Sequence, residues 1–492
     1  MTDTKETWPR RDLARLTGAH ARPIGLIDSA RFLAKNECEA IARRAFNFAS
    51  GGGRTVVRIS SWWQGEVRWA RNRVSLASDR RDISVNIGRI VVDEHAGEVV
   101  TNQTDDASLE AAVRAAERMA YVHHAGLRPV PFDPPPVPIL PRPTTAIWSD
   151  ATYDLTTEGR GEVARAIIGP AEAKGMLSAG YLEVRGASHL LVDSDRPTQD
   201  APWDVPYSRW TQAQLSMTVR DQQGTGSGWA GLSSYDWSSI EAEQIGARAL
   251  EKCLASRNPV VIEPGRYTVI LEPQAVADLM EIVAGSMDRQ AAEGGDGPWR
   301  LPRGRTKLGL KVVDERITIR HDPVDPQLGI VFGNLVMGEQ AVTWIDHGVL
   351  TNLAYDLAYA LGKLHANTGV RGMTGYRMSG GETSIDEMIT TTKRGLLVTR
   401  FSHIHVLDLE SLLSTGLTRD GLWLIENGKI TKAVKNFRFT ESPLFVLNSL
   451  DALGPPERVF RPTILESGEL TPAIVPPIKA RDFSFTSTID AI

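Results

Sequence analysis

In the first half of the chain, the spacing of apolar residues alternates between that of an amphipathic helix and that of a β-strand. Helical spacing marks residues 29–49, after the candidate N-cap Asp28, and again marks residues 107–124. Between these helices, runs such as TVVRISSWW and DISVNIGRIVVD have the composition and alternation of strands. The same order of helix, β-meander and helix returns at 156–255. We interpret 29–122 and 156–255 as an internal duplication, with two unrelated α+β units as the alternative.

The second half of the chain is dominated by strand-like runs. A short apolar run at 267–272 leads into a helical stretch at 273–289, and strands and turns follow from Ile317 onward. Residues 394–443 are interpreted as a β-meander with the strands LLVTRF, HIHVLDL, GLWLIE and ITKAVKNFRF. TRDG and ENGK are the expected turns, because Asp-Gly and Asn-Gly tolerate positive φ in hairpins. The whole pattern predicts an α+β fold with a β-rich C-terminal domain.

Composition changes along the chain suggest the boundaries of its parts. Residues 1–27 are expected to form an N-terminal extension, and 28–258 an N-terminal α+β domain with a Pro-rich connection at 129–143. The β-rich domain is placed at 259–450 and a Pro-rich tail at 451–492. The glycines near the start of 291–309 predict an exposed loop there.

Charge and hydropathy exclude several classes of partner. The net charge is −5 at pH 7, so no basic surface for nucleic acid is expected. Tryptophans 62, 63 and 69 alternate with arginines, which we interpret as ring packing under arginine stems. Neither a signal peptide nor an apolar run of about 18 residues is seen, so we expect no membrane contact and a cytoplasmic location. Cys38 and Cys253 alone form neither a disulfide framework nor a zinc pattern.

Four ordered strings between Arg394 and Phe439 carry a family resemblance. They are RGLLVT, STG, GLWLIENGKIT and AVKNFRF, and they resemble the C-terminal domain of the TldD/PmbA family, the TldD/TldE peptidase family. The resemblance extends over about residues 30–450. Its N-terminal half shares the layout of elements more than their residues.

The resemblance also locates where the chemistry of the peptidase members would lie. In those members a helix carries a zinc-binding His-Glu-x-x-x-His motif, and a cysteine in the C-terminal meander is a further ligand. On this chain the motif falls on Met280 through Gly285, so only its glutamate is present, as Glu281. The place of the cysteine falls near Phe401–Ser402. Methionine is a weak zinc ligand and glycine offers no side chain, so the resemblance implies that this chain holds no metal or other cofactor.

In lacking these ligands, the chain resembles the PmbA/TldE-like members of the family. Those members are understood to pair with a TldD-like chain and to complete a closed cavity. The resemblance implies a non-catalytic subunit of a heterodimeric zinc metallopeptidase for small or unstructured peptides, with the zinc in its partner. Glu281 either faces the partner's cavity and contacts a substrate amine or is an ordinary surface glutamate. Thr368, Gly369, Gly372 and Gly375 lie where family members have a glycine-rich segment, so they are candidates for a peptide-binding wall.

Two alternatives stay open. His403 and His405 lie two apart on a predicted strand, so their imidazoles are expected on one face. Together with Glu281, His365 or His347 they would make a relocated metal site in a stand-alone metallopeptidase, whereas a polar strand needs no metal. The third hypothesis is a homodimeric peptide-binding or scaffold protein without catalysis.

Overall fold

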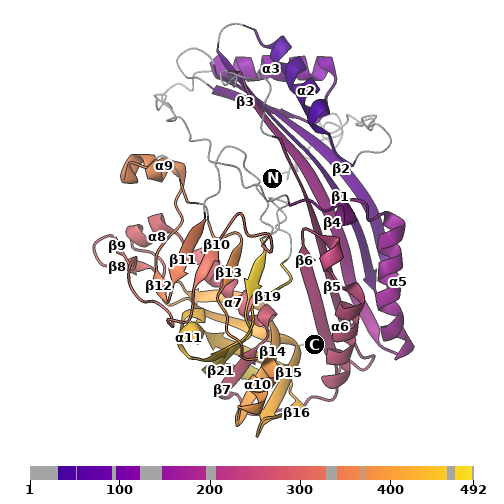
Figure 1. Cartoon of the computed structure of the whole chain (residues 1–492), viewed down its shortest axis with the longest axis vertical. Helices are drawn as coiled ribbons and strands as arrows, with labels where there is room; N and C mark the ends of the chain where they lie inside the picture. Colours follow the sequence, from indigo (N-terminus) through magenta and orange to yellow (C-terminus); the bar gives the residue numbers. More distant parts are fainter. Residues whose placement is uncertain are drawn as a thin grey trace, which may run out of the picture.

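The computed structural model describes residues 31–50, 53–90, 96–121, 147–194, 207–328, 341–366, 369–370, 372–461 and 471–489. A long, curved sheet from the N-terminal half rises beside a more compact C-terminal part built on two further sheets (Figure 1). The predicted α+β class is confirmed. Residues 1–27 and 129–143 lie outside the described ranges, within which no helix is long and apolar enough to cross a membrane.

The N-terminal sheet is built from the same order of elements used twice. Each half contributes a helix, three antiparallel strands and a second helix, and the strand order is β3-β2-β1-β4-β5-β6. The two halves therefore meet at β1 and β4, and the third strand of each half forms an edge. The elements are α2 (Lys35–Phe48), β1 (Arg54–Ala70), β2 (Arg73–Ile90), β3 (Ala96–Thr101), α3 (Asp106–Tyr121), α4 (Asp150–Tyr153), α5 (Thr157–Ala173), β4 (Leu177–Asp193), β5 (Tyr207–Arg220), β6 (Ser227–Ser234) and α6 (Ala242–Ala255).

The four long helices cover one face of this sheet. Val57 and Ile59 of β1 pack with α2 and α3, and further along the same strand Trp63 and Val67 belong to the core under α5 and α6. Because side chains alternate along a strand, the intervening positions project from the opposite face. That face carries polar residues and meets the C-terminal part at β5 and β6, where Ser233 hydrogen-bonds to the main chain of Arg461.

One glycine in the third strand of each half lets the following helix approach closely. A Cβ at Gly97 of β3 would lie 2.1 Å from the carbonyl oxygen of Ala116 in α3. A Cβ at Gly228 of β6 would lie 2.2 Å from the carbonyl oxygen of Ala249 in α6. Both contacts are far below any real Cβ separation. In both halves, therefore, a glycine allows the second helix to pack closely against the third strand.

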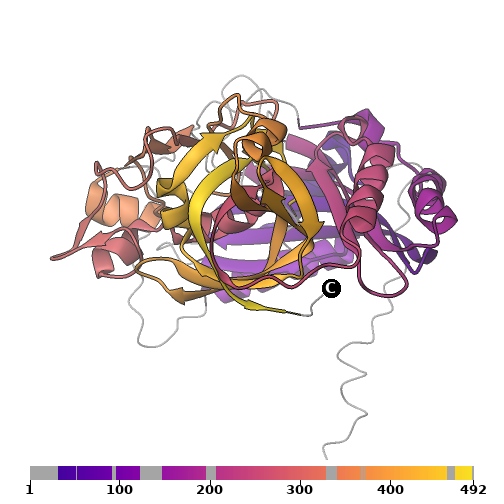
Figure 2. The ribbon, with the colours of Figure 1, turned by 90° about the horizontal axis from the view of Figure 1, so that it is seen from below.

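Five strands of the C-terminal part close into a ring, seen from below in Figure 2. They pair in the order β14-β7-β21-β17-β15, and β15 returns to β14. The ring consists of β7 (Gly265–Leu271), β14 (Arg394–Asp408), β15 (Leu413–Glu426), β17 (Phe437–Glu441) and β21 (Ile478–Thr488), with β16 (Lys429–Ala433) and β18 (Leu450–Leu453) attached. Stacked phenylalanines, including Phe401 and Phe483, fill its interior.

A second C-terminal sheet and helix α7 share the core of the ring. The strand order is β12-β11-β10-β13-β20-β19, with only β13 and β20 parallel. Its strands are β10 (Ile319–His321), β11 (Val342–Asp346), β12 (Val349–Leu350), β13 (Tyr376–Met378), β19 (Glu457–Arg458) and β20 (Ala473–Val475). Around the ring and this sheet lie α7 (Pro273–Ser286), α8 (Arg289–Gly294), β8 (Arg300–Leu301), β9 (Arg305–Thr306), α9 (Leu357–Tyr359), α10 (Ile385–Thr390) and α11 (Pro443–Asn448). Apolar residues of α7 belong to one cluster with residues of both sheets.

Three expectations about the second half are corrected. The Pro-rich region 451–492 is not a tail where it is described, because β21 pairs with both β7 and β17 and Phe483 is fully buried. The TRDG segment lies inside β15 rather than in a turn. The expected exposed loop at 291–309 includes the end of α8 and the buried Trp299, which belongs to the core around α7.

Candidate functional site

Helix α7 presents a polar face on an otherwise apolar helix. Gln274, Asp278, Glu281 and Gly285, spaced three and four apart, are the positions of this face, and each is at least partly exposed. Met280 is only 1% exposed and packs in the shared core. Of the two positions assigned to the family's histidines, Met280 is therefore buried, whereas Gly285 lies on the polar face.

No shift of the family motif along α7 places a histidine at either ligand position. Its sequence, PQAVADLMEIVAGS, contains neither histidine nor cysteine. A Cβ at Gly285 would meet no atom within 4 Å, so the missing side chain is not excluded by crowding. Across the described part of the chain, no group of three or more His, Cys, Asp or Glu side chains is arranged to hold a metal ion.

Glu281 is held by an arginine from a distant segment. Its Oε1 lies 2.5 Å from Nη1 of Arg461, whose side chain is 11% exposed while that of Glu281 is 51% exposed. Arg461 also donates from Nε to the carbonyl oxygen of Thr471. Its main-chain N–H donates to Oγ of Ser233 at 2.7 Å, which ties it to β6. The polar face of α7 is thus joined to the N-terminal sheet through Arg461.

Asp278 is the most enclosed charged group on this face. Its Oδ1 accepts from Nε2 of Gln274 at 2.9 Å, and its Oδ2 accepts from the main-chain N–H of Phe401 at 2.8 Å. Burial, reinforced by the nearby Glu281 carboxylate, raises the pKa of Asp278 to about 6 despite these hydrogen bonds and the opposing effect of Arg400. This carboxyl group therefore exchanges a proton close to neutral pH.

The raised pKa of Asp278 predicts a pH-dependent stability difference. Because an unfolded aspartate has a pKa of about 3.9, ionisation of Asp278 destabilises the folded state above pH 6, and this cost disappears as the pH falls toward about 4. Asp278→Asn is therefore expected to raise the free energy of unfolding by up to about 3 kcal/mol at alkaline pH and by little in acid. Urea unfolding across this range measures the gap, with the exposed Asp154→Asn as control. A gap that does not change with pH would contradict the assignment.

A second buried carboxylate joins the two halves of the chain. Asp420, in β15, is 1% exposed, and its Oδ1 accepts from Oγ of Ser227 in β6 at 2.6 Å. Its Oδ2 lies 3.1 Å from Nε of Arg400. The Arg400 guanidinium is 4.6 Å from the ring centre of Trp229, also in β6. This cluster fixes β6 against β14 and β15, next to the polar face of α7.

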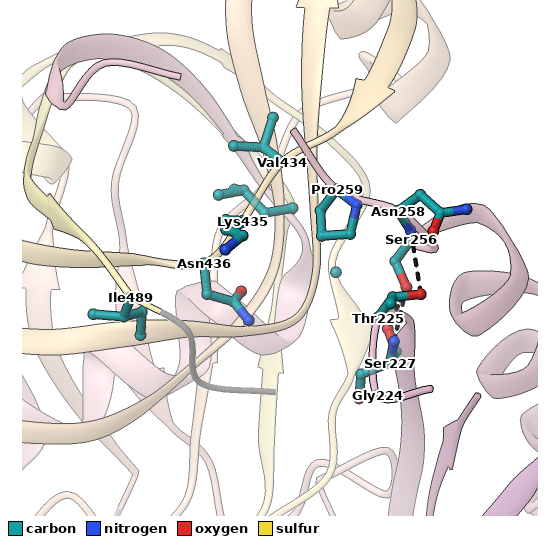
Figure 3. A pocket seen from close by; sticks show the side chains of 12 residues that line it. Gly224, Thr225, Ser227, Ser256, Asn258, Pro259, Val434, Lys435, Asn436 and Ile489 are labelled. Carbon is teal, nitrogen blue, oxygen red and sulfur yellow. Dashed lines mark hydrogen bonds between the residues drawn. The ribbon is translucent and has the colours of Figure 1, made fainter. Parts of the chain in front are cut away.

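A cavity of about 320 Å³ lies beside the same junction (Figure 3). Thr225 and Ser256 line one side of it, and Lys435 and Asn436 line the other. The main-chain N–H of Asn258 donates to Oγ1 of Thr225 across the segment that links the two halves. Among the described residues that line the cavity, none belongs to α7, so the cavity is separate from the face that carries Glu281.

The two candidate metal ligands on β14 lie on an irregular stretch of strand. His403 and His405 are both exposed, and the pairing of β14 with β15 shifts register between Ser402 and His405. His403 has a φ of +52°, which breaks the regular alternation that places residues i and i+2 on one face. His347 bonds to Asp346, and His365 ends the turn after α9. Within the described residues these imidazoles join no group suited to a metal.

The glycine-rich candidates are only partly described. Thr368 lies outside the described residues. A Cβ at Gly369 would lie 2.8 Å from the carbonyl oxygen of Tyr355, so this glycine permits a close main-chain approach. Gly372 is exposed, and the buried Gly375 accepts a hydrogen bond at its carbonyl from Nδ1 of His321. Their role as a peptide-binding wall stays a prediction.

The fold is shared with several proteins of known structure. A proposed modulator of a DNA gyrase from Thermotoga maritima MSB8 has a TM-score of 0.73 and 16% identity, covering 91% of this chain and 100% of its own. A second such protein, from Bacteroides thetaiotaomicron VPI-5482, has a TM-score of 0.72 and 18% identity, with 93% and 100% covered. TldE from Thermococcus kodakarensis has a TM-score of 0.71 and 17% identity, with 91% and 99% covered. No curated protein matches the chain by sequence.

A family model identifies the class of the C-terminal half. Residues 264–487 match the PmbA/TldA metallopeptidase C-terminal domain. This range contains α7, the ring and the second sheet, including β21 in the region that was expected to be a tail. Over these residues the chain resembles the TldD/PmbA family.

Sequence reasoning located Glu281 but missed the residues around it. Asp278 carries a detectable signal, because it is a charged residue at helical spacing from Gln274 and Glu281 on an apolar helix. Arg461 carries none, since it lies about 180 positions away in a region without clear periodicity. Asp420 was assigned to a turn, which hid its buried contact with Ser227.

Proposed function

We propose that this chain is the metal-free subunit of a TldD/TldE-type heterodimeric zinc peptidase that acts on small or unstructured peptides. The observation that carries the proposal is the position of helix α7 together with the residues that it contains. The helix keeps its place between the ring and the second sheet and keeps Glu281, but it has no histidine or cysteine. The match of residues 264–487 to the PmbA/TldA metallopeptidase C-terminal domain and the fold shared with TldE support the partner role.

The Glu281–Arg461 pair is consistent with a binding role rather than a catalytic one. A glutamate that serves as general base must reach a water molecule with a free oxygen. Here one oxygen of Glu281 is bound to a buried guanidinium, and α7 offers no histidine to hold a zinc ion that would activate a water for the other oxygen. The half-exposed second oxygen remains suited to a cationic group such as a peptide amine. Peptide hydrolysis would then depend on zinc held by the partner.

The proposal is tested with the chain alone and in a mixture. The purified chain is expected to contain substoichiometric zinc by elemental analysis and to leave an unfolded protein such as casein intact. Adding a TldD-like chain with an intact His-Glu-x-x-x-His motif is expected to give a co-purifying complex that cleaves the substrate. A partner whose motif glutamate is replaced by glutamine serves as the inactive control. Stoichiometric zinc in the lone chain, or no complex with any such partner, would overturn the proposal.

The relocated site predicts a different result for one variant. If His403 and His405 held a metal, the double variant His403→Ala/His405→Ala would lose it together with any activity. Because both side chains are exposed on an irregular strand, we expect the double variant to match the wild type in metal content, complex formation and cleavage rate. Loss of zinc in this variant would instead support the stand-alone metallopeptidase. Stable self-association without activity in any mixture would support the homodimeric scaffold.

A further inference from the structure

Strand register places three arginines in one row on the second C-terminal sheet. Arg320 of β10 lies opposite Arg377 of β13. Ile474 of β20 lies opposite Arg377 on one side and opposite Arg458 of β19 on the other. Residues opposite each other on neighbouring strands share a face of the sheet. The three arginines are therefore on one face, across the strands that Figure 1 labels β10, β13 and β19.

Only one of these arginines has a carboxylate partner among the described residues. Nε of Arg377 lies 2.8 Å from Oδ2 of Asp325. Arg458 donates to a main-chain carbonyl oxygen of the segment after β10. Burial lowers the pKa of Arg458 to about 10, so it is still charged at neutral pH. Arg320 is exposed and makes no ion pair or side-chain hydrogen bond within the described part of the chain.

A cavity of about 480 Å³ is lined by Arg320 and Arg377. Its other lining residues come from the segment after β10 and are Asp322, Val324, Asp325, Pro326 and Gln327. Two main-chain turns shape this segment, because Oδ1 of each aspartate accepts from the N–H two residues further on, at 3.1 Å and 2.9 Å. The volume is within the range of about 300–1,000 Å³ that is typical of small-molecule sites. The cavity therefore offers room for a small ligand beside the guanidinium of Arg320.

The lining of this cavity combines both signs of charge with apolar surface. Asp322 is half-buried and makes no ion pair with a described residue, so its carboxylate can accept an ammonium group. The planar guanidinium of Arg320 can bind a carboxylate through two parallel hydrogen bonds. Val324, which is 53% exposed, and Pro326 add apolar surface. A ligand that matches all three properties has a carboxylate, an ammonium group and a short apolar side chain.

We infer that this cavity binds a free apolar α-amino acid, with its carboxylate on Arg320 and its ammonium group at Asp322. The side chain of the amino acid would contact Val324 and Pro326. A dianion such as phosphate fits less well, because the two aspartates offset two of the three arginines and leave one net positive charge. The inference does not depend on the proposed function, since none of the described residues that line the cavity belongs to α7.

The inference is tested by isothermal titration calorimetry on the full chain, in a buffer without carboxylates. The probe is L-leucine, which is expected to bind the wild type. Two analogues each lack one charged group: 4-methylpentanoate has no amine and 3-methylbutylamine has no carboxylate. Both are expected to bind more weakly than leucine, because each loses one of the two charged contacts. Failure of leucine to bind, or tighter binding of inorganic phosphate than of leucine, would overturn the inference.

Substitutions at the two charged residues separate their contacts. Arg320→Gln is expected to weaken leucine binding about 10- to 100-fold, because it removes the charge-assisted hydrogen bonds to the carboxylate. Arg320→Lys keeps the charge but not the planar fork, so an intermediate loss is expected. Asp322→Asn keeps an oxygen for the N–H of Val324, so the turn is retained. It is expected to weaken the binding of leucine but not that of 4-methylpentanoate, which has no amine.

Arg165→Gln is the matched control for the arginine variant. It removes one exposed positive charge from α5, in the N-terminal half of the chain, and is expected to bind leucine as the wild type does. Because Arg320 is exposed, both glutamine variants are expected to unfold at the wild-type urea concentration. Unchanged leucine affinity in Arg320→Gln, or an equal loss in Arg165→Gln, would overturn the inference. Neither result would affect the proposed subunit role, which depends on α7.

Discussion

Replacing Asp420 by alanine is expected to destabilise the chain by about 3–5 kcal/mol. The substitution removes the acceptor of the Ser227 hydroxyl and leaves the Arg400 guanidinium without its carboxylate partner at the junction of β6 with β14. A buried charge that loses its partner costs far more than an exposed one, because water cannot replace the interaction. Alanine also tolerates the φ of +57° at this position poorly. Urea unfolding measures the loss.

Asp420→Asn separates the charge from the backbone effect. Asparagine accepts positive φ and keeps an oxygen for Ser227, so it removes only the charge that faces Arg400. We expect it to cost less than alanine and to leave the unfolding transition cooperative. If Asp420→Ala instead unfolds at the wild-type urea concentration, the contact between β15 and β6 does not hold the N-terminal sheet against the C-terminal part.

Asp420 also shows why local turn signals were only half successful. The sequence contains two dipeptides typical of hairpins, Asp420-Gly421 and Asn427-Gly428. Asn427 and Gly428 have φ of +50° and +79° and connect β15 to β16, as the pattern predicts. Asp420 and Gly421 also have positive φ, but the strand continues through them with an irregular register. The dipeptide specifies the backbone conformation, and its tertiary contact with Ser227 decides between bulge and turn.

The distribution of apolar residues predicted elements better than it predicted boundaries. The helix–meander–helix order of the first half was visible because each element has its own period. The strands after 451 were not, because a Pro-rich composition favours a tail and the pairing of β21 with β7 bridges about 200 residues. Long-range pairing leaves no local signal, so the C-terminal strand of the ring had to come from the structure.

The residues of the candidate site also differ in whether the local sequence could predict them. Glu281 and the missing ligands could be identified from α7 alone, since a helix carries its own spacing. Arg461 and Ser233 could not, because their relation to Glu281 depends on three segments that meet only in the fold. Residues on strands are brought together by register, which single-strand patterns do not encode.

Gly97→Ala and Gly228→Ala are each expected to destabilise the chain by roughly 3 kcal/mol, and by similar amounts. The new Cβ atoms would lie 2.1 Å and 2.2 Å from helix carbonyl oxygens, so the edge strand or its helix must move. Main-chain atoms cannot rotate away as a flexible side chain can. Because β6 also carries Ser233 and Trp229, displacement there is expected to disturb their contacts with Arg461 and Arg400 as well, whereas displacement of β3 is not.

Gly161→Ala provides the matched control for both glycine variants. A Cβ at Gly161 of α5 would meet no atom within 4 Å, so alanine there is expected to stabilise the helix by about 0.5–1 kcal/mol. Equal losses at Gly97 and Gly228, measured by urea unfolding, would show that both halves depend on the same strand–helix contact. A loss at Gly228 alone would mean that only the half bearing Ser233 requires this close approach. The two halves of the N-terminal sheet would then share the order of their elements but not the contact that stabilises them.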